Sequence, residues 1–590
     1  MNLAEAFQAA VTQHQAGQLK EAESLYRQIL AAAPDHAHAT HMLGVLALQC
    51  GQVPQAIELI TRAIRLEGNQ PLFHANLGAA YLAAGNLAQA EASARRALAL
   101  EARDARLWLA LGKVLQRRTD MTGARTAYQQ ALQLEPRLSD AAVALGDLEA
   151  SQTRWPQAEQ AYRVAANFES PSATLLTRLA VSLQAQGKLA DAIAKYREAL
   201  SLEPRYTSAH YNLGTALNER GERDEAARHF EQALICNPNH AGSHSNLGAY
   251  HQDQGNLDEA LDHYGQVLQV EPDAPEAHYN RALILLMQGN FEQGWPEYEW
   301  RQQLPGFPVR RVPGTRWDGA PTEKRVLIHA EQGLGDTLHF VRYLQEAHRR
   351  CPQLRLQVPE VLLPLLRQSG MGKRLIGTTE PADCDMQAPL LSLPLLLNAN
   401  VEDAGALVPY LSADPDAVIA WGQRLEAFPG KRIGIVWQGS PTHASDGRRS
   451  ISLKHFVPLA ALPGVTLISL QKGAGSDQRP AAGFDVHEPA ESWDEASGPF
   501  VDTAAIMKNL DLVVTADTAT AHLAGGLGVP VWVALATKAD WRWFLSGDRT
   551  PWYPTMRLYR QTHAGDWDAV FQRIANDIQE LFSESRPSHR

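Results

Sequence analysis

A period of 34 residues constrains the first half of this chain more than any other feature. Leu-Gly pairs recur at this interval from residues 43–44 to 247–248, with Leu-Ala at 179–180. An alanine stands twelve positions after each of these slots, at Ala56, Ala90, Ala124, Ala158, Ala192, Ala226 and Ala260. Prolines share a further register, at Pro34, Pro136, Pro204, Pro238 and Pro272. The spacing predicts repeated helix–turn–helix units, with small residues where two helices approach and proline after the second helix.

These units resemble the tetratricopeptide repeat, with about nine copies between Ala4 and Leu304. We therefore expect residues 1–304 to form an α-solenoid. The resemblance implies a concave groove that binds an extended segment of a protein acceptor. Residues 305–322, which are rich in proline, are expected to form a linker.

An asparagine stands immediately before the Leu-Gly slot, or its equivalent, in four units: Asn76, Asn212, Asn246 and Asn280. Because each amide offers a donor and an acceptor, such a ladder would suit a peptide backbone in an acceptor groove. Local satisfaction of neighbouring polar groups is an equally open interpretation. A histidine lies two residues before each asparagine, and one histidine per repeat predicts a packing role rather than a shared metal site.

After residue 322 the apolar pattern changes to short runs rich in β-branched residues. The runs span 325–330, 354–359, 432–437, 465–470, 511–516 and 529–535, and helical stretches separate them. Strands that alternate with helices predict a doubly wound α/β fold with parallel sheets. The pattern loosens between Asn398 and Pro429, so we expect two lobes, 323–415 and 416–590. Ligands of such folds bind at the carboxyl ends of the strands.

Three loops follow predicted strands and open helices. The first, residues 330–340, contains Gly333, Gly335 and Asp336. The second, residues 437–450, ends close to Arg448 and Arg449, whose guanidinium groups suit phosphate oxygens. The third, residues 515–522, would offer helix amino-terminal amides to a diphosphate. Taken singly, each loop is more often a helix cap or a solvated turn.

Taken together, the loops resemble a known enzyme family. EQGLGDTLHFVRYL, DMQAPLLSLP, GIVWQGSPTHASDGRRSISL, the segment 502–535 and TKADWRW resemble glycosyltransferases of the GT-B type, most closely the lipopolysaccharide heptosyltransferase-like family. The whole chain is similar to bacterial fusions of tetratricopeptide repeats to that domain, which include flagellin glycosyltransferases. The resemblance implies a GT-B fold with two Rossmann-like lobes, a catalytic and acceptor-side lobe at 323–415 and a nucleotide-sugar lobe at 416–590.

The resemblance also implies roles for single residues. Asp336 occupies the position of the general base, which takes the proton of the acceptor hydroxyl. Arg449, with Arg448 beside it, occupies the position that assists the leaving diphosphate. Ala519 stands where the family has glycine, which implies a tighter fit or a different donor. The donor-binding positions are Gly333, Gly335, Trp437, Gln438, Gly439, Arg448, Gln471, Lys472, Asp517, Thr518, Ala519, Thr520 and His522.

Composition excludes several other classes of protein. The chain has 65 acidic against 54 basic residues and a net charge of −11, which disfavours nucleic acid as a partner. No apolar run reaches the length of about 18 residues that spans a membrane, so we expect no membrane insertion. Four scattered cysteines and an amino terminus without a signal pattern predict a cytoplasmic protein. The pairs in Asp383-Cys384-Asp385 and Asp414-Pro415-Asp416 have metal-motif spacing, but GT-B enzymes generally need no metal, and we expect none.

The resemblance, together with the repeats, implies an inverting, metal-independent glycosyltransferase. It would move a sugar from a nucleotide-sugar donor to a Ser or Thr hydroxyl of a protein acceptor, with flagellin as the favoured acceptor. Two alternatives stay open: a lipid-linked or polysaccharide acceptor, and a non-catalytic adaptor whose GT-B domain has lost its chemistry. UDP-, ADP-, GDP- and CMP-linked sugars are all open as donors.

Overall fold

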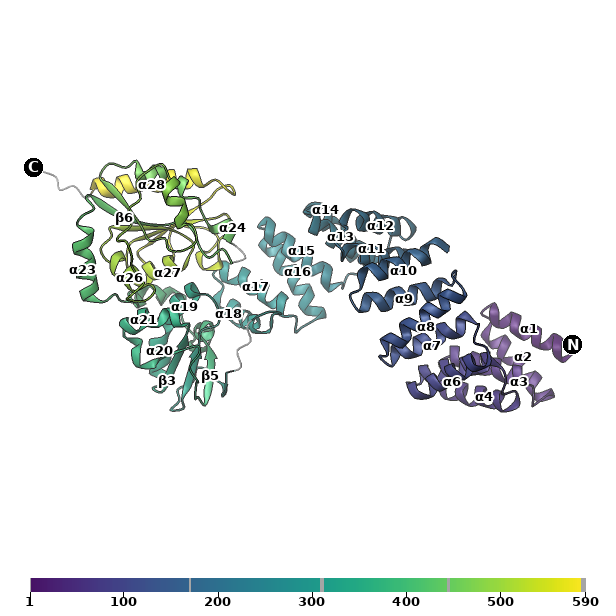
Figure 1. The fold of residues 1–590 in the computed structure, drawn as a ribbon. Coiled ribbons are helices and arrows are strands. Elements are labelled where there is room, and N and C mark those ends of the chain that lie inside the picture. The colour runs from purple at the N-terminus through teal and green to yellow at the C-terminus, as the bar shows by residue number, and fades with distance from the viewer. Residues whose placement is uncertain (1, 169–170, 308–311, 443–445, 585–590) are drawn as a thin grey trace, which may run out of the picture. The chain divides into compact units, whose positions relative to one another are not determined.

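The computed structural model describes residues 2–168, 171–307, 312–442 and 446–584 (Figure 1). The chain divides into two compact units, Met1–Asn256 and Leu257–Arg590. The described helices of the first unit are α1 (Leu3–Gln15), α2 (Leu19–Ala32), α3 (Ala37–Gln49), α4 (Val53–Leu66), α5 (Pro71–Ala83), α6 (Leu87–Leu100), α7 (Ala105–Arg117), α8 (Met121–Leu134), α9 (Ser139–Ser151), α10 (Trp155–Phe168), α11 (Ala173–Gln184), α12 (Leu189–Leu202), α13 (Thr207–Arg220), α14 (Arg223–Cys236) and α15 (Ala241–Gln254).

Small residues let the helices of each repeat pack closely, as the period predicts. In the pair α13–α14, a Cβ atom on Gly214 would lie 2.6 Å from Cε1 of Phe230. Ala226 of the same pair is buried, as are its equivalents in the other repeats. A larger residue at either position would force the two helices apart.

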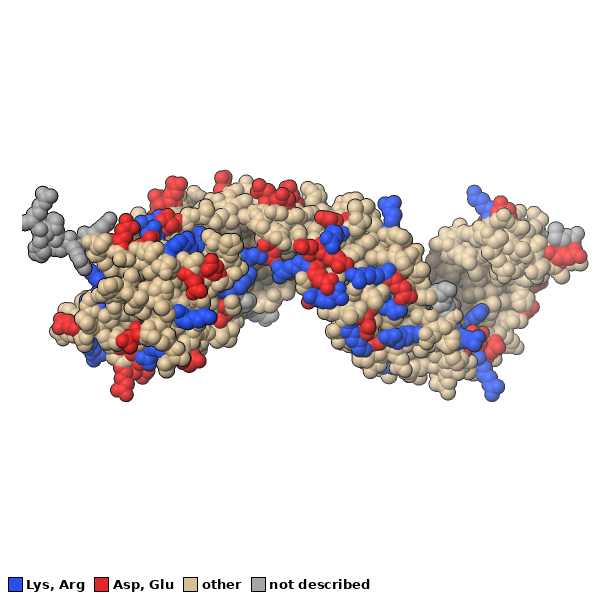
Figure 2. All heavy atoms as spheres, turned by 90° about the horizontal axis from the view of Figure 1, so that it is seen from above, with Lys and Arg blue, Asp and Glu red and all other residues tan. Residues whose placement is uncertain are grey.

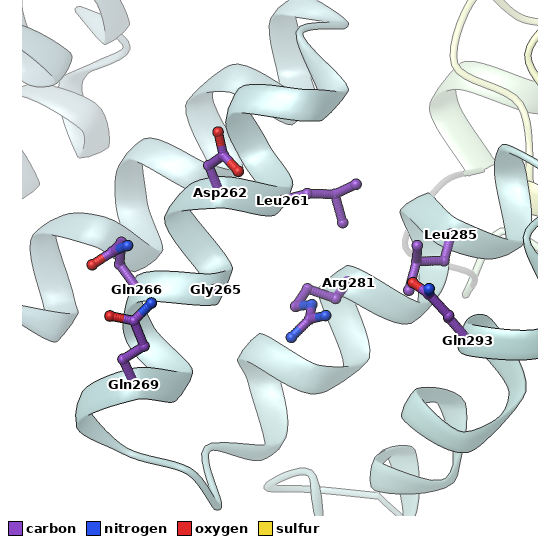
Figure 3. A pocket seen from close by; sticks show the side chains of 8 residues that line it. All are labelled: Leu261, Asp262, Gly265, Gln266, Gln269, Arg281, Leu285 and Gln293. Atoms are coloured by element: carbon purple, nitrogen blue, oxygen red, sulfur yellow. The ribbon is translucent and has the colours of Figure 1, made fainter.

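The second unit begins with three further repeat helices, α16 (Leu257–Val270), α17 (Pro275–Met287) and α18 (Phe291–Tyr298), followed by the 3₁₀ helix η1 (Glu299–Gln303). A pocket of about 310 Å³ opens among α16, α17 and α18 (Figure 3). The repeat helices thus continue past the boundary between the two units.

Aromatic packing explains why these helices belong to the unit of the sheets. The ring of Trp295 lies 5.4 Å from that of Trp541, and Phe291 lies 5.7 Å from Trp552, measured between centroids. Tyr298 also contacts Trp541, at 6.1 Å. These residues join one apolar core with the strands and helices of the α/β part.

The α/β part contains two five-stranded sheets whose paired strands are all parallel. The first has the order β1-β5-β2-β3-β4, and the second β10-β9-β8-β6-β7. The strands are β1 (Thr315–Arg316), β2 (Val326–His329), β3 (Leu354–Val358), β4 (Leu375–Gly377), β5 (Met386–Pro389), β6 (Lys431–Val436), β7 (Val465–Ser469), β8 (Leu512–Ala516), β9 (Val531–Leu535) and β10 (Met556–Arg560).

Helices cover both faces of the second sheet, as a doubly wound fold requires. Val513 and its neighbours on one face pack with α26 (Val501–Met507) and α27 (Ala519–Gly526). Val514 and the alternate residues pack on the other face with α28 (Trp567–Glu584). The remaining α-helices are α19 (Leu334–Phe340), α20 (Leu344–Arg350), α21 (Leu363–Leu366), α22 (Leu393–Leu397), α23 (Pro415–Leu425), α24 (Asp446–Arg449) and α25 (Val457–Ala460).

All six runs that the sequence predicts as strands are strands, and the α/β class is confirmed. Four strands, β1, β4, β5 and β10, are additional to the prediction. No helix among the described residues is both long and apolar enough to cross a bilayer. On the face seen in Figure 2, basic and acidic side chains are interspersed.

Candidate functional site

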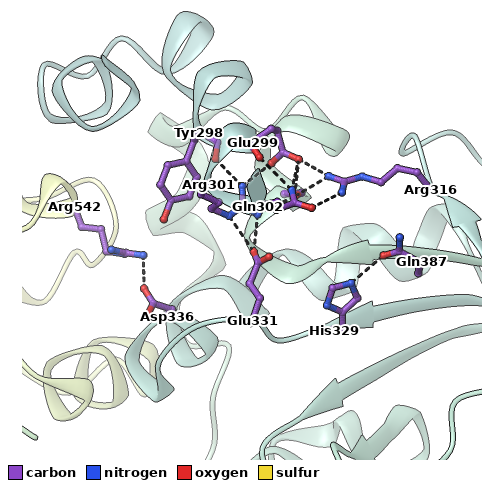
Figure 4. A network of polar contacts seen from close by, with 11 residues as sticks. Tyr298, Glu299, Arg301, Gln302, Arg316, His329, Glu331, Asp336, Gln387 and Arg542 are labelled. Atoms are coloured by element: carbon purple, nitrogen blue, oxygen red, sulfur yellow. Dashed lines mark hydrogen bonds and ion pairs between the residues drawn. The ribbon is translucent and has the colours of Figure 1, made fainter. Parts of the chain in front are cut away.

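Asp336 lies in the first turn of α19, directly after the loop that leaves β2. The backbone N–H of Gly333 donates to its Oδ2 atom at 3.0 Å, which makes Gly333 the amino-terminal cap of the helix. Its Oδ1 atom accepts a hydrogen bond of 2.5 Å from Nη2 of Arg542 (Figure 4). The carboxylate is therefore held from both sides and remains partly exposed.

Arg542 is a functional candidate to which the sequence assigned no role. It lies in η10 (Trp541–Trp543), within the TKADWRW segment, and its side chain is buried. Besides Asp336, it donates to Oδ1 of Asp540 at 2.8 Å, and its guanidinium lies 4.4 Å from the ring centroid of Trp541. Burial disfavours the charged form, but the carboxylates of Asp540 and Asp336 raise the pKa of Arg542 above its ordinary value.

Two helix amino termini, one from each sheet, meet beside this ion pair. Gly335 of α19 approaches α27 so closely that a Cβ atom there would lie 3.1 Å from Cδ2 of His522 and 3.5 Å from Cα of Ala519. Gly335 thus serves the approach of the two helices. The residues predicted for the donor side, Thr518 as the cap of α27 and Thr520 in its first turn, lie at the same junction.

His522 is engaged by protein groups at this junction. Its Nδ1 atom lies 2.9 Å from the hydroxyl oxygen of Tyr553, and its ring stacks on Trp543 at a centroid distance of 5.3 Å. Burial lowers the pKa of His522 well below its ordinary range. The imidazole is therefore neutral, and its observed contacts position α27 against the rest of the unit.

Asp517, at the end of β8, is the most perturbed carboxyl of the site. Burial and the nearby charge of Asp540 raise its pKa to about 7, although Arg449 and Arg542 oppose the shift. Arg449 packs beside Gly439, where a Cβ atom would lie 2.9 Å from its Nη2. Arg448 is exposed on the same short helix, α24. Arg449 of α24 and Arg542 of η10 thus both lie close enough to favour the charged form of Asp517.

Because folding raises the pKa of Asp517 from 3.8 to about 7, its contribution to stability is present at low pH and is lost as the pH rises through 7. We expect Asp517→Asn to stabilise the protein relative to wild type, with a gain that grows by about 1 kcal/mol per pH unit between pH 5 and 7. Guanidinium unfolding of both proteins at pH 5 and pH 8 measures this difference. An equal difference at the two pH values would contradict the assignment.

Hydrogen bonds join the loop after β6 to the loop after β7, and they involve residues predicted to bind the donor. Oε1 of Gln471 accepts from the backbone N–H groups of Trp437 and Gln438, at 3.1 and 3.0 Å. Trp437 is buried and donates its indole N–H to the carbonyl of Gly475. Lys472 donates to the carbonyl of Trp493. The structure thus gives these side chains intramolecular partners that spacing could not indicate.

A buried ion pair ties the end of the repeat array to the loop that carries Asp336 (Figure 4). The fully buried Arg301 of η1 donates from Nη2 to Oε1 of Glu331 at 2.5 Å and from Nη1 to Oε1 of Glu299 at 2.8 Å. Burial raises the pKa of Glu331. Burial would also raise that of Glu299, but Arg301 and Ser392 lower it below its ordinary value. The sequence missed this pair, because its partners are 30 residues apart in dissimilar segments.

The asparagines of the proposed ladder occupy equivalent, half-buried positions on α5, α13, α15 and α17. Nδ2 of Asn76 lies 2.9 Å from Nε2 of His41, and Nδ2 of Asn246 donates to the carbonyl of Gly242 at 2.8 Å. In Asn76 and Asn246, the amide nitrogen therefore already has a partner within the repeats. Asn212 and Asn280 are the other two asparagines of the ladder.

The repeated histidines have a structural role. In each case Nε2 lies within 3.0 Å of the carbonyl oxygen six residues earlier, in the turn before the helix; the residues are His74, His210, His244 and His278. The repeated bond fixes the turn between successive repeats. This is the packing role that one histidine per repeat predicts.

The aspartate pairs with metal-motif spacing have other partners. Asp383 and Asp385 form ion pairs with Arg325, and Asp414 caps α23 by accepting from the N–H of Asp416. Within the described ranges, no cluster of three or more His, Cys, Asp or Glu side chains is placed to hold a metal ion.

Comparison with known proteins identifies the repeats. Models of the tetratricopeptide repeat match residues 13–79, 75–136, 109–174, 177–241, 229–262 and 251–289. The helical array is therefore built of tetratricopeptide repeats, and such repeats bind proteins or peptides.

A curated relative and several solved structures share part of the chain. Protein FlbA of Caulobacter vibrioides is 28% identical over 316 residues, which are 49% of this chain and 52% of FlbA. The chain thus spans about half the length of that relative. YrrB, a tetratricopeptide-repeat protein with an unusual peptide-binding site, is 21% identical over 32% of this chain and 98% of its own, with a TM-score of 0.29. The carboxy-terminal part of a repeat protein from Cytophaga hutchinsonii is 14% identical over 41% of this chain and 98% of its own, with a TM-score of 0.35.

Proposed function

We propose that this chain is a glycosyltransferase that modifies a Ser or Thr hydroxyl on a protein held by its tetratricopeptide repeats. One observation carries the proposal: the carboxylate of Asp336 lies at a helix amino terminus where two parallel α/β sheets meet, opposite the amino terminus of α27. The motifs on both helices are those in which the sequence resembles GT-B glycosyltransferases. Flagellin is the acceptor that this resemblance favours.

Asp336 is suited to act as the general base. Each carboxylate oxygen has two lone pairs, and the bonds from Gly333 and Arg542 use one on each oxygen. A free lone pair takes the proton of the acceptor hydroxyl while the hydroxyl oxygen attacks the anomeric carbon of the donor. The bond from this carbon to the phosphate oxygen breaks, the nucleotide diphosphate leaves with the electron pair, and the anomeric centre inverts.

The amino terminus of α27 and Arg449 form the proposed site of the leaving diphosphate. Helix amino termini favour anions through their free N–H groups and dipole. Arg449 supplies a positive charge, and its Nε atom forms no hydrogen bond with another described residue. With a pKa of about 7, Asp517 is largely protonated below neutral pH, which reduces its repulsion of a diphosphate. No metal ion is part of this proposal.

Removal of the first unit separates this function from transfer to a small acceptor. A fragment of residues 257–590 retains the repeat helices that pack on the sheets, whereas a cut at 304 would remove Trp295 and Tyr298 and expose the part of the core that they cover. We expect the fragment to bind nucleotide diphosphates as the full chain does, but to modify flagellin at least tenfold more slowly. Intact mass spectrometry of flagellin, with cell extract as the source of donor, measures the transfer.

Two results would favour a different acceptor or a different role for the first unit. Equal modification of flagellin by the fragment and the full chain would show that the first unit does not recruit the acceptor. Transfer by both proteins to a lipid-linked or polysaccharide sugar, with none to flagellin, would overturn the protein acceptor. Nucleotide diphosphate titration checks that the fragment is folded.

A further inference from the structure

The pocket among α16, α17 and α18 arises where the last repeats depart from the period. At the position of Gly265, every earlier repeat carries a larger residue: Arg27, Thr61, Arg95, Gln129, Arg163, Arg197 and Glu231. At the position of Arg281, the second to eighth repeats all carry leucine: Leu43, Leu77, Leu111, Leu145, Leu179, Leu213 and Leu247. The combination of Gly265 and Arg281 is thus particular to one place in the array.

The glycine leaves open space, and the arginine brings a charge into the lining. A Cβ atom added to Gly265 would meet no other heavy atom within 4 Å, so the helix surface there is bare. Arg281 replaces a leucine that fills the junction between helices in the other repeats, and its Nη1 atom lies 3.5 Å from Oε1 of Glu297. The resulting pocket of about 310 Å³ is large enough for a side chain and its adjacent backbone.

The lining of the pocket combines amides, one charge of each sign and an apolar wall (Figure 3). Gln266 and Gln269 of α16 and Gln293 of α18 provide the amides, and their side chains bond to no other residue within the described ranges. Arg281 provides a cation and Asp262 an anion. Leu261 and Leu285 form the apolar wall.

We infer that this pocket binds a side-chain amide, from an asparagine or glutamine, of the acceptor protein. The lining amides can each donate to and accept from another amide, and the opposite charges of Arg281 and Asp262 leave the lining without a net charge that would select an ion. The apolar wall suits the aliphatic stem of glutamine. This inference rests on the proposed function, because the amide that fills the pocket belongs to the acceptor protein that the repeats recruit.

Two substitutions in the full chain alter the pocket in different ways. Gly265→Arg fills it with the residue that four earlier repeats carry at this position, and Arg281→Leu restores the leucine of the period. The matched control is Gln129→Arg, which adds the same charge at the equivalent exposed position of a repeat in the first unit. Arg281→Leu conforms to the repeat pattern, so we expect this variant to fold. Thermal unfolding of all variants checks that none is misfolded.

The binding of purified flagellin, measured by titration calorimetry, is the test. We expect Gly265→Arg and Arg281→Leu each to weaken binding at least tenfold, with Gln129→Arg and nucleotide diphosphate binding unchanged. Alanine replacement of the bound asparagine or glutamine in flagellin should weaken binding to wild type but not to Arg281→Leu. Wild-type binding by both pocket variants would overturn the inference while leaving the proposed function intact. A wild-type chain that does not bind flagellin would overturn the proposed acceptor and, with it, this occupant.

Discussion

Asp336→Asn is expected to slow sugar transfer by about 10²- to 10⁴-fold, because a carboxamide cannot take the proton of the acceptor hydroxyl. The substitution keeps the shape of the side chain and an oxygen that can still accept from Arg542. Binding of nucleotide diphosphate should therefore stay close to that of wild type. Transfer rates from intact mass spectra of the acceptor, with calorimetric titration of the nucleotide, measure the two effects separately.

Asp540→Asn is the matched control for this prediction. Asp540 is the other carboxylate that accepts a hydrogen bond from Arg542, at 2.8 Å, so its substitution disturbs the same guanidinium without removing the base. We expect a smaller loss than for Asp336→Asn. If both variants transfer sugar at the same reduced rate, the role of Asp336 is to pair with Arg542, and another group is the base.

Arg301→Met is expected to destabilise the second unit by about 3–5 kcal/mol, the usual consequence of leaving buried carboxylates without their partner. Arg301 is 0% exposed and Glu331 4%, so solvent cannot replace the lost ion pair. Denaturant unfolding of residues 257–590 measures the change. The loop that carries Asp336 should also become less stable, because Glu331 belongs to that loop.

Two further variants make the Arg301 prediction specific. Arg316 also pairs with Glu299 but is 40% exposed, so Arg316→Met should cost less than about 1 kcal/mol. The double variant with Arg301→Met and Glu331→Gln should recover part of the lost stability, because it removes the unpaired charge. Wild-type stability of Arg301→Met alone would show that the ion pair does not hold the repeats to the sheets.

Periodicity predicted the parts of the fold that repeat. The Leu-Gly register indicated the helical pairs because a glycine such as Gly214 is needed where a partner ring such as Phe230 packs. Buried parallel strands such as β8 are almost continuously apolar and were evident from composition. Strand β10 (Met556–Arg560) escaped because two of its five residues are arginines, and β1 has only two residues.

The candidate site was only partly predictable for a different reason. Asp336 lies in a local motif, whereas its partner Arg542 is 206 residues away, and no spacing indicates such a contact. Gln471 and His522 stay predicted donor-binding residues, and the structure adds their partners in the fold, which the sequence did not indicate. Local spacing indicates which residues share a loop, and only the packing of the two sheets decides which loops meet.

The intact mass of flagellin from cells with and without this protein tests the central claim most directly. We predict a discrete added mass on flagellin, attached at Ser or Thr, in cells that contain the wild-type chain. This mass should be absent both from cells that lack the protein and from cells that carry Asp336→Asn. Flagellin of identical mass in all three kinds of cell would contradict the account.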